Sequence, residues 1–224
     1  MKAIIPAKTN SGRVLNKNWR EFHDNKCLVE IKIEQLTDAG FSDIYVSCED
    51  ESKRSLVESS GASFILRNDD YTKDSMHWSD VVTEVISSVP CTDEEDIAWV
   101  PPCVPLFGAK DFAVAKHLWE TMDSDFDCLI TVKKFKEFVL DEKGKPLNFS
   151  FGRWHEWSQD LPQWFILESP IHIMKKSTYL RCKYYIGERP YLHIVPSPSI
   201  DIDVLEEFEL AQEIYSLRHS KCPK

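Results

Sequence analysis

The stretch "AIIPAKTNSGRVLNKN", residues 3–18, joins a short apolar run to a polar loop rich in cations. The run Ala3–Ala7 has the length and composition of a buried strand. The loop that follows and its flanks hold four cations, namely Lys8, Arg13, Lys17 and Arg20. The chain as a whole carries a formal net charge of −10. A local group of cations on an acidic chain predicts a bound anion or neutralisation by nearby carboxylates.

Length and composition restrict the class of protein. The chain has 224 residues, of which 42% are hydrophobic and 29% charged, and this fits one globular domain, 1–224. No apolar run approaches the roughly 20 residues of a membrane span, and the first residues are too short for a secretory signal. The net negative charge disfavours sequence-independent nucleic-acid binding. Seven scattered cysteines without a C-x-x-C pair predict free thiols in a reducing cytoplasm rather than a zinc site.

Short apolar runs alternate with stretches of helical periodicity over the first 132 residues. We expect strands at 3–7, 43–47, 63–66, 96–100 and 127–132, with helices at 27–39, 52–60, 79–89 and 110–122, and a last helix at 204–217. Strands separated by helices of this length pair in parallel through right-handed crossovers. The sequence therefore predicts an α/β fold with a Rossmann-like, doubly wound, mostly parallel sheet. In such sheets ligands bind beyond the carboxyl ends of the strands, where the cationic loop would lie.

The segment 133–170 departs from this alternation and is rich in aromatic residues. These are Phe135, Phe138, Phe149, Phe151, Trp154, Trp157, Trp164 and Phe165. We interpret the segment as a β-rich dimerisation arm inserted in the domain, and expect a homodimer. A local satellite core is an equally weighted alternative.

The cationic loop is the first stretch that could carry chemistry. Backbone N–H groups and cations after a strand can hold a polyphosphate, and Gly12 would allow close approach of the backbone to it. Neither the P-loop pattern nor the dinucleotide-binding glycine pattern is present. The alternative is an ordinary solvated loop.

The second stretch is "SIDID", residues 199–203. In an extended backbone Asp201 and Asp203 point to the same side, while Ile200 and Ile202 point to the core. Two carboxylates held together favour a divalent cation, which offsets their repulsion. The alternative for Asp203 is a capping box with Glu206 at the start of the last helix.

Together these stretches resemble a known family. "IIPAKTNSGRVLNKNWR" resembles the I-x-A-R-x-x-S-K-G-x-P-x-K-N signature of the acylneuraminate cytidylyltransferases, and "SIDIDVLEEFELAQEI" resembles their closing S-I-D-I-D element. Between them, "GFSDIYVSCEDE", "FILRNDDYTKDSMHWSDVV" and "WVPPCVPLF" occur in the family's order. The resemblance covers nearly the whole chain.

The resemblance implies that an acceptor oxygen attacks the α-phosphorus of CTP and expels pyrophosphate, with Mg²⁺ or another divalent cation bound. It implies that Lys17, Asp201 and Asp203 are catalytic and that the two aspartates bind the metal. It implies a nucleotide site made by Lys8, Asn10, Ser11, Gly12, Arg13, Lys17, Asn18 and Arg67. The work of such a site is positioning and charge neutralisation.

The departures from the family fall mainly on the acceptor side. The Q-P-T-S-P-L-R element is Pro101–Phe107 here, which removes an amide, two hydroxyls and a guanidinium. In "SQDLPQWFILES" the family's arginine is Ser158 and its Asn-Gly is Glu168-Ser169. The corresponding acceptor-binding positions are Pro102, Cys103, Gln159 and Glu168. A nonulosonic acid would leave polar groups unpaired in such a site.

These changes predict a cytidylyltransferase for a different small anionic acceptor, such as an unusual nonulosonate or a phosphonate. The alternatives are an enzyme that uses another nucleotide and a protein that has lost activity but keeps the fold.

Overall fold

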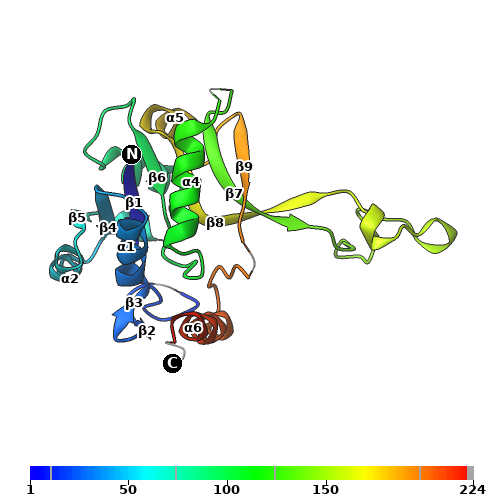
Figure 1. Cartoon of the computed structure of the whole chain (residues 1–224), viewed down its shortest axis with the longest axis horizontal. Helices are drawn as coiled ribbons and strands as arrows, with labels where there is room; N and C mark the ends of the chain where they lie inside the picture. Colours follow the sequence, from blue (N-terminus) through cyan, green and yellow to red (C-terminus); the bar gives the residue numbers. More distant parts are fainter. Residues whose placement is uncertain (11, 74, 124, 197, 221–224) are drawn as a thin grey trace.

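A seven-stranded sheet forms the centre of the molecule (Figure 1). The computed structural model describes residues 1–10, 12–73, 75–123, 125–196 and 198–220. In spatial order the strands are β5 (Ser63–Leu66), β4 (Ile44–Cys48), β1 (Lys2–Pro6), β6 (Asp96–Trp99), β8 (Trp164–Lys175), β7 (Cys128–Phe135) and β9 (Pro190–Ile194). Neighbouring strands are parallel, except that β8 runs antiparallel to both β6 and β7.

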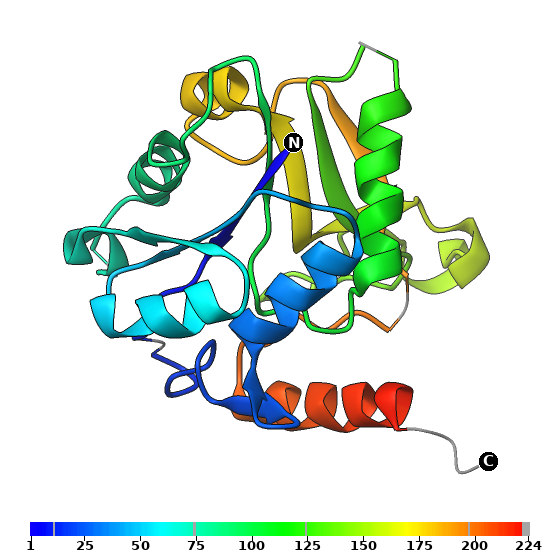
Figure 2. The same ribbon diagram turned by 60° about the vertical axis from the view of Figure 1, so that its left-hand side comes forward.

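Helices cover both faces of the sheet, as the doubly wound fold requires (Figure 2). One core cluster joins the sheet to α1 (Leu28–Asp38), α2 (Arg54–Ser59) and α4 (Ala109–Thr121). The cluster on the opposite face joins it to α3 (Trp78–Ser87) and α5 (Lys176–Cys182). Alternate strand residues supply the two clusters, because successive side chains point to opposite faces.

A third core cluster brings the two ends of the chain together. It packs Val14 and Phe22 against Ile202 and against Phe208 of α6 (Leu205–His219). Phe22 lies in a short hairpin, β2 (Glu21–His23) with β3 (Lys26–Cys27), and its ring is 5.2 Å from that of Phe208. The loop after β1 is therefore held against the segment that carries Asp201 and Asp203.

The predicted fold class is confirmed, and the expected strands and helices lie within a few residues of the observed ones. The sequence did not predict β8, β9, α5 or the β2–β3 hairpin. β8 is antiparallel because the chain leaves the sheet along β7 and returns along β8 as the second half of one long hairpin. α5 has only seven residues and β9 is a half-exposed edge strand, so neither shows a strong period.

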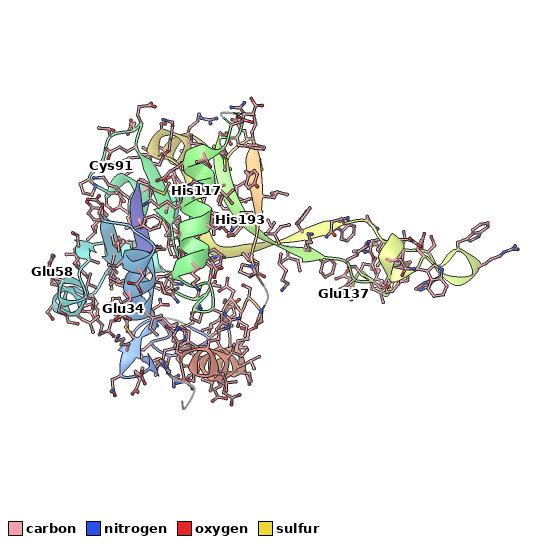
Figure 3. All side chains as sticks on the ribbon, in the orientation of Figure 1. Glu34, Glu58, Cys91, His117, Glu137 and His193 are labelled. Atoms are coloured by element: carbon pink, nitrogen blue, oxygen red, sulfur yellow. The ribbon has the colours of Figure 1, made fainter. Side chains whose placement is uncertain are left out.

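The segment 133–170 is an arm that extends from the sheet (Figure 1). Its base is a ladder from Lys133↔Ile166 to Phe135↔Trp164, and two short 3₁₀ turns, η3 (Gly152–Trp154) and η4 (Ser158–Asp160), lie near its end. Figure 3 places Glu137 on this arm, away from the body that carries Glu34. The arm is thus less β-rich than we expected.

The arm's aromatic residues fall into a packed group and an exposed group. Phe138 packs on Phe149 and stacks on His155, with ring centroids 4.9 Å apart in both pairs, which makes a small local cluster. In contrast, Trp154 and Trp157 are 75% and 73% exposed. The described helices include none that is long and apolar enough to cross a membrane.

Candidate functional site

A cavity of about 540 Å³ lies at the carboxyl ends of β1, β5 and β6. This is where a doubly wound sheet binds its ligands. Nine of the predicted site residues line it: Lys8, Gly12, Arg13, Lys17, Asn18, Arg67, Pro102, Cys103 and Asp203. The cavity therefore joins the cationic loop, the third-strand arginine, the Pro-Pro-Cys turn and the carboxyl-terminal aspartate.

The cationic loop contacts the aspartate segment directly. Arg13 Nη2 lies 2.7 Å from Asp203 Oδ1, and Lys17 Nζ lies 3.8 Å from the same oxygen. Lys17 also donates a hydrogen bond to the Ile202 carbonyl. Arg20 lies outside the group that lines the cavity, and its guanidinium packs over the Phe208 ring. Residues about 190 positions apart thus form one charged cluster.

The structure corrects the expected capping box of the last helix. The carboxylate of Glu207, rather than Glu206, accepts hydrogen bonds from the backbone N–H groups of Asp203 (2.6 Å) and Val204 (3.1 Å). The side chain of Asp203 is therefore not used as the helix cap and faces Arg13 instead. Asp203 therefore lines the cavity, whereas Asp201 is not among the residues that line it.

Glu49, which the sequence analysis did not select, organises the nucleotide side. It follows β4, and its Oε1 accepts hydrogen bonds of 2.6 Å from both the backbone N–H and the hydroxyl of Thr9. Its Oε2 lies 3.2 Å from Arg67, and both side chains are nearly buried, at 7% and 4% exposure. Burial would raise the pKa of Glu49, but the hydrogen bonds from Thr9 and Arg67 outweigh it and hold the pKa below its ordinary value. The sequence did offer one indication of this role, because Glu49 directly follows the strand predicted at 43–47.

Asn18 fixes the loop from inside. Its side chain donates a 3.1 Å hydrogen bond to the carbonyl of Lys8, and its own carbonyl accepts from the N–H of Val29. Asn10 is exposed and does not line the cavity. Ser11 lies outside the described residues.

Asp201 lies in a more buried position than Asp203. Burial raises its pKa, the carboxylates of Asp203 and Glu168 add to this, and a hydrogen bond with the Cys103 thiol and the charge of Lys17 oppose it. Burial also raises the pKa of Cys103, so the thiol stays protonated and serves as the donor. Burial is thus the main reason that the pKa of Asp201 lies above its ordinary value.

Two carboxylates on one short segment fit a divalent cation, which offsets their repulsion. No group of three or more His, Cys, Asp or Glu side chains among the described residues is arranged to hold a metal. The chain can therefore offer two carboxylates, Asp201 and Asp203, and further ligands would have to come from phosphate oxygens and water. This is the way Mg²⁺ is commonly bound in nucleotide sites.

The predicted acceptor residues are separated in the structure. Pro102 and Cys103 line the cavity. Glu168 is buried on β8, where Ser199 donates a 2.9 Å hydrogen bond to it and Lys133 lies 3.4 Å away. Gln159 is exposed in η4 on the arm, and the structure does not bring it to the cavity of its own chain. A neighbouring copy would be needed for Gln159 to reach an acceptor.

Comparisons with known proteins agree with this geometry. A family model described as cytidylyltransferase matches residues 2–98. An N-acylneuraminate cytidylyltransferase from Escherichia coli O18:K1:H7 is 26% identical over 215 residues, which cover 93% of this chain and 50% of that protein. The same enzyme from Streptococcus agalactiae serotype III is 23% identical over 214 residues, covering 92% and 51%. The chain spans about half the length of the curated relatives it matches.

Solved structures show the same fold. A CMP:2-keto-3-deoxy-manno-octonic acid synthetase complexed with CTP aligns with a TM-score of 0.66 at 14% identity, covering 97% of this chain and 98% of the other. A 4-diphosphocytidyl-2C-methyl-D-erythritol synthase from Anaerococcus prevotii aligns with a TM-score of 0.65 at 12% identity, covering 96% and 95%. The predicted fold is therefore confirmed, and the predicted resemblance is supported by a sequence similarity to N-acylneuraminate cytidylyltransferases that extends over most of the chain.

Proposed function

We propose that the protein transfers CMP from CTP to an acidic sugar or a related small anionic acceptor and releases pyrophosphate. The observation that carries this proposal is the meeting of Arg13 and Lys17 with Asp203 at one cavity. Support comes from the names of the relatives, which are N-acylneuraminate and 3-deoxy-manno-octulosonate cytidylyltransferases.

In this proposal the chain's residues position the triphosphate and neutralise its charge. Lys8, Arg13 and Lys17 bind phosphate oxygens, and Lys17 and Arg13 offset the charge that develops on the leaving pyrophosphate. Arg67 lies against the nucleotide, held in place by Glu49. Asp201 and Asp203 would hold Mg²⁺, which when bound neutralises phosphate charge and acts as a Lewis acid.

Calorimetric titration with CTP, UTP, ATP and GTP, each with Mg²⁺, tests the nucleotide. Tighter binding of CTP supports the proposal, and preference for another base favours the related nucleotidyltransferase. Absence of binding to all four favours an inactive protein that keeps the fold. Pyrophosphate release from CTP with a panel of acidic sugars and phosphonates then tests the reaction. The double variant Asp201→Asn/Asp203→Asn should abolish the Mg²⁺-dependent release of pyrophosphate.

We further propose that the arm pairs two copies of the chain. The support is the exposure of Trp154 and Trp157, together with the position of Gln159 on the same arm. Light scattering after gel filtration should give a dimer mass, and the double variant Trp154→Ser/Trp157→Ser should shift it toward the monomer. A monomeric parent chain would refute this.

A cytoplasmic location is also part of the proposal. Six cysteines are free thiols in the described part of the chain, as expected in a reducing compartment, and Cys222 lies outside it. Fractionation of cells that express the chain tests this.

A further inference from the structure

The ladder between β7 and β8 is irregular at the point where the arm joins the sheet (Figure 1). Ile130 pairs with His172, but the next paired residue of β7, Val132, lies opposite Leu167. A single residue of β7 therefore stands opposite the whole stretch 168–171 of β8. Extra residues of this kind form a bulge, which bends the strand and re-aims its side chains, and bulges are frequent next to active sites.

Local contacts hold this bulge in one shape. The buried hydroxyl of Thr131 donates a hydrogen bond across it, with its oxygen 2.9 Å from the carbonyl of Glu168 and 2.8 Å from that of Ile171. Pro170 lies within the bulge and has no N–H group that the interrupted ladder would leave unpaired. The backbone that carries the Glu168 side chain is thus fixed from inside the sheet.

The Glu168 side chain uses both of its oxygens in contacts with other parts of the chain. It is only 8% exposed, and its Oε2 accepts a 2.9 Å hydrogen bond from the hydroxyl of Ser199. Its Oε1 lies 3.4 Å from the amine of Lys133 on β7. A buried carboxylate requires such partners, because its removal from water is costly. Glu168 is therefore built as an anchor for Ser199.

Ser199 is the first residue of the aspartate segment, residues 199–203. Near the other end of the segment, the N–H of Ile202 donates a 3.0 Å hydrogen bond to the carbonyl of Cys103, beside the cavity. The segment is thus attached to β8 at its start and to the Pro-Pro-Cys turn near its end. Asp201 lies between these two attachments, so its position depends on both.

We propose that Glu168 is a positioning residue, which holds the aspartate segment through Ser199 in the place from which Asp201 and Asp203 would bind a divalent cation. A segment that is already fixed loses less conformational freedom when the cation binds, and binding is stronger for that reason. This inference rests on the proposed function. It gives a role to a position at which the sequence departs from the family, whose asparagine is replaced by Glu168.

Calorimetric titration with CTP, once with Mg²⁺ and once with EDTA, measures this role apart from catalysis. We expect Ser199→Ala and Glu168→Gln each to reduce the factor by which Mg²⁺ strengthens CTP binding about fivefold, the effect of one average hydrogen bond. CTP affinity with EDTA should stay unchanged. Because both variants affect one hydrogen bond, the double variant should be no weaker than the weaker single variant.

A matched control is available outside the cavity. The hydroxyl of Ser88 donates a 2.7 Å hydrogen bond to the carbonyl of Val85 at the end of α3. Ser88→Ala therefore removes a serine hydrogen bond of similar length without affecting the aspartate segment. This variant should leave the effect of Mg²⁺ on CTP binding unchanged.

Hydrogen exchange without nucleotide measures the order of the segment directly. The amide of Ile202 is protected by the Cys103 carbonyl, and that of Asp203 by the carboxylate of Glu207. Both amides should exchange at least about fivefold faster in Ser199→Ala and in Glu168→Gln than in the parent chain, and at the parent rate in Ser88→Ala. Unchanged exchange in both variants overturns the inference, whether or not CTP binds.

The two measurements separate this inference from the proposed function. Faster exchange with equal losses of CTP affinity in Mg²⁺ and in EDTA also overturns the inference, because Glu168 would then only support the fold of the nucleotide site. Absence of CTP binding to the parent chain refutes the proposed function. In that case the exchange rates alone decide whether Glu168 positions the aspartate segment.

Discussion

The two ends of the cavity differ in how the chain builds them. The cationic end comes from one loop, residues 8–18, that closes on the segment 201–203, and both stretches match a family pattern. The aromatic side of the cavity combines Trp78 of α3 with Trp99 of β6, two elements from the middle of the chain. The charged side of the cavity thus depends on contact between the two ends of the chain, and the aromatic side depends on elements from its middle.

The two sides of the cavity are also held in place by different hydrogen bonds. On the nucleotide side, Glu49 and Asn18 tie the loop to β4, to Arg67 and to α1 through buried or half-buried hydrogen bonds. On the aromatic side, Tyr185 lies in a loop that Asp127 holds by accepting backbone hydrogen bonds from Glu188 and Arg189. Variants that affect only one end should therefore change either the kinetics of CTP or those of the acceptor.

The largest effect is expected from Lys17→Met. Its amine contacts Asp203 and the Ile202 carbonyl and lies in the cavity, where a charge-assisted hydrogen bond is worth roughly 1.5–3 kcal/mol. If Lys17 binds both the ground state and the leaving pyrophosphate, pyrophosphate release should fall about 100-fold. The matched control is Lys26→Met, because Lys26 pairs with Glu34 outside the cavity and should leave the rate within about twofold. Equal losses in both variants would contradict a special role for Lys17.

Features with a local sequence pattern could be predicted from the sequence, and features that depend on non-local contacts could not. Periodicity and turn residues were sufficient for the parallel part of the sheet. Of the two aspartates in "SIDID", Asp203 lines the cavity, and the shared site of Asp201 and Asp203 stays a prediction. β8 was missed because its direction depends on the long hairpin with β7, a non-local feature. Glu49 was missed because its importance lies in contacts with Thr9 and Arg67 rather than in a motif.

The second prediction is that Glu49→Gln lowers the stability of the protein and its affinity for CTP, and leaves the KM for the acceptor unchanged. An amide cannot pair with the buried Arg67 guanidinium, so we expect a loss of about 2 kcal/mol in unfolding free energy and a roughly tenfold higher KM for CTP. The pKa of Glu49 is lower in the folded state, so the ionised form contributes stability above the unfolded pKa that is lost as the pH falls through the folded pKa. We therefore expect the difference in unfolding free energy between the parent chain and Glu49→Gln to decrease as the pH falls from 7 to 3. Urea unfolding of both proteins over this range measures it.

The exposed neighbour provides the control for that experiment. Glu51→Gln removes a surface ion pair with Arg54 and should cost less than about 0.5 kcal/mol. An unchanged KM for CTP in Glu49→Gln would show that Glu49 stabilises the fold without positioning the loop.

The third prediction concerns Gly187, in the loop of Tyr185, whose ring packs on Trp78 and Trp99 of the cavity wall. A Cβ at Gly187 would lie 2.4 Å from Asp127 Oδ1, and Asp127 cannot move freely because it accepts from two backbone N–H groups. Gly187→Ala should therefore shift the loop of Tyr185 and destabilise the fold by roughly 1–2 kcal/mol. We expect a higher KM for the acceptor with an unchanged KM for CTP. Gly108→Ala is the control for crowding, since its Cβ would lie 4.0 Å from its nearest neighbour. Gly108 is the N-cap of α4, so we expect the cost of alanine at an N-cap, below about 1 kcal/mol, and no change in either KM.

The smallest effect is expected at Lys32, which connects α1 to the turn behind both ends of the cavity. Its buried amine donates a 2.9 Å hydrogen bond to the Val104 carbonyl, and burial lowers its pKa to about 7, although Cys103 and Asp111 act to raise it. Between pH 7 and the ordinary pKa of lysine, the unfolded chain binds a proton that the folded chain lacks. The unfolding free energy should therefore rise with pH in this range, by at most about 1.4 kcal/mol per pH unit.

Lys32→Met removes this dependence together with the hydrogen bond. The parent chain should gain stability relative to the variant, by about 1 kcal/mol, as the pH rises from 7 to 8, while below pH 6 the difference should be constant. Urea unfolding of both proteins at pH 6, 7, 8 and 9 measures this, and the titration of other groups cancels in the comparison. A difference that stays constant or reverses would mean that Lys32 remains charged in the folded protein. In that case the amine would hold the Val104 carbonyl as a buried cation over the Phe112 ring, 4.8 Å from its centroid.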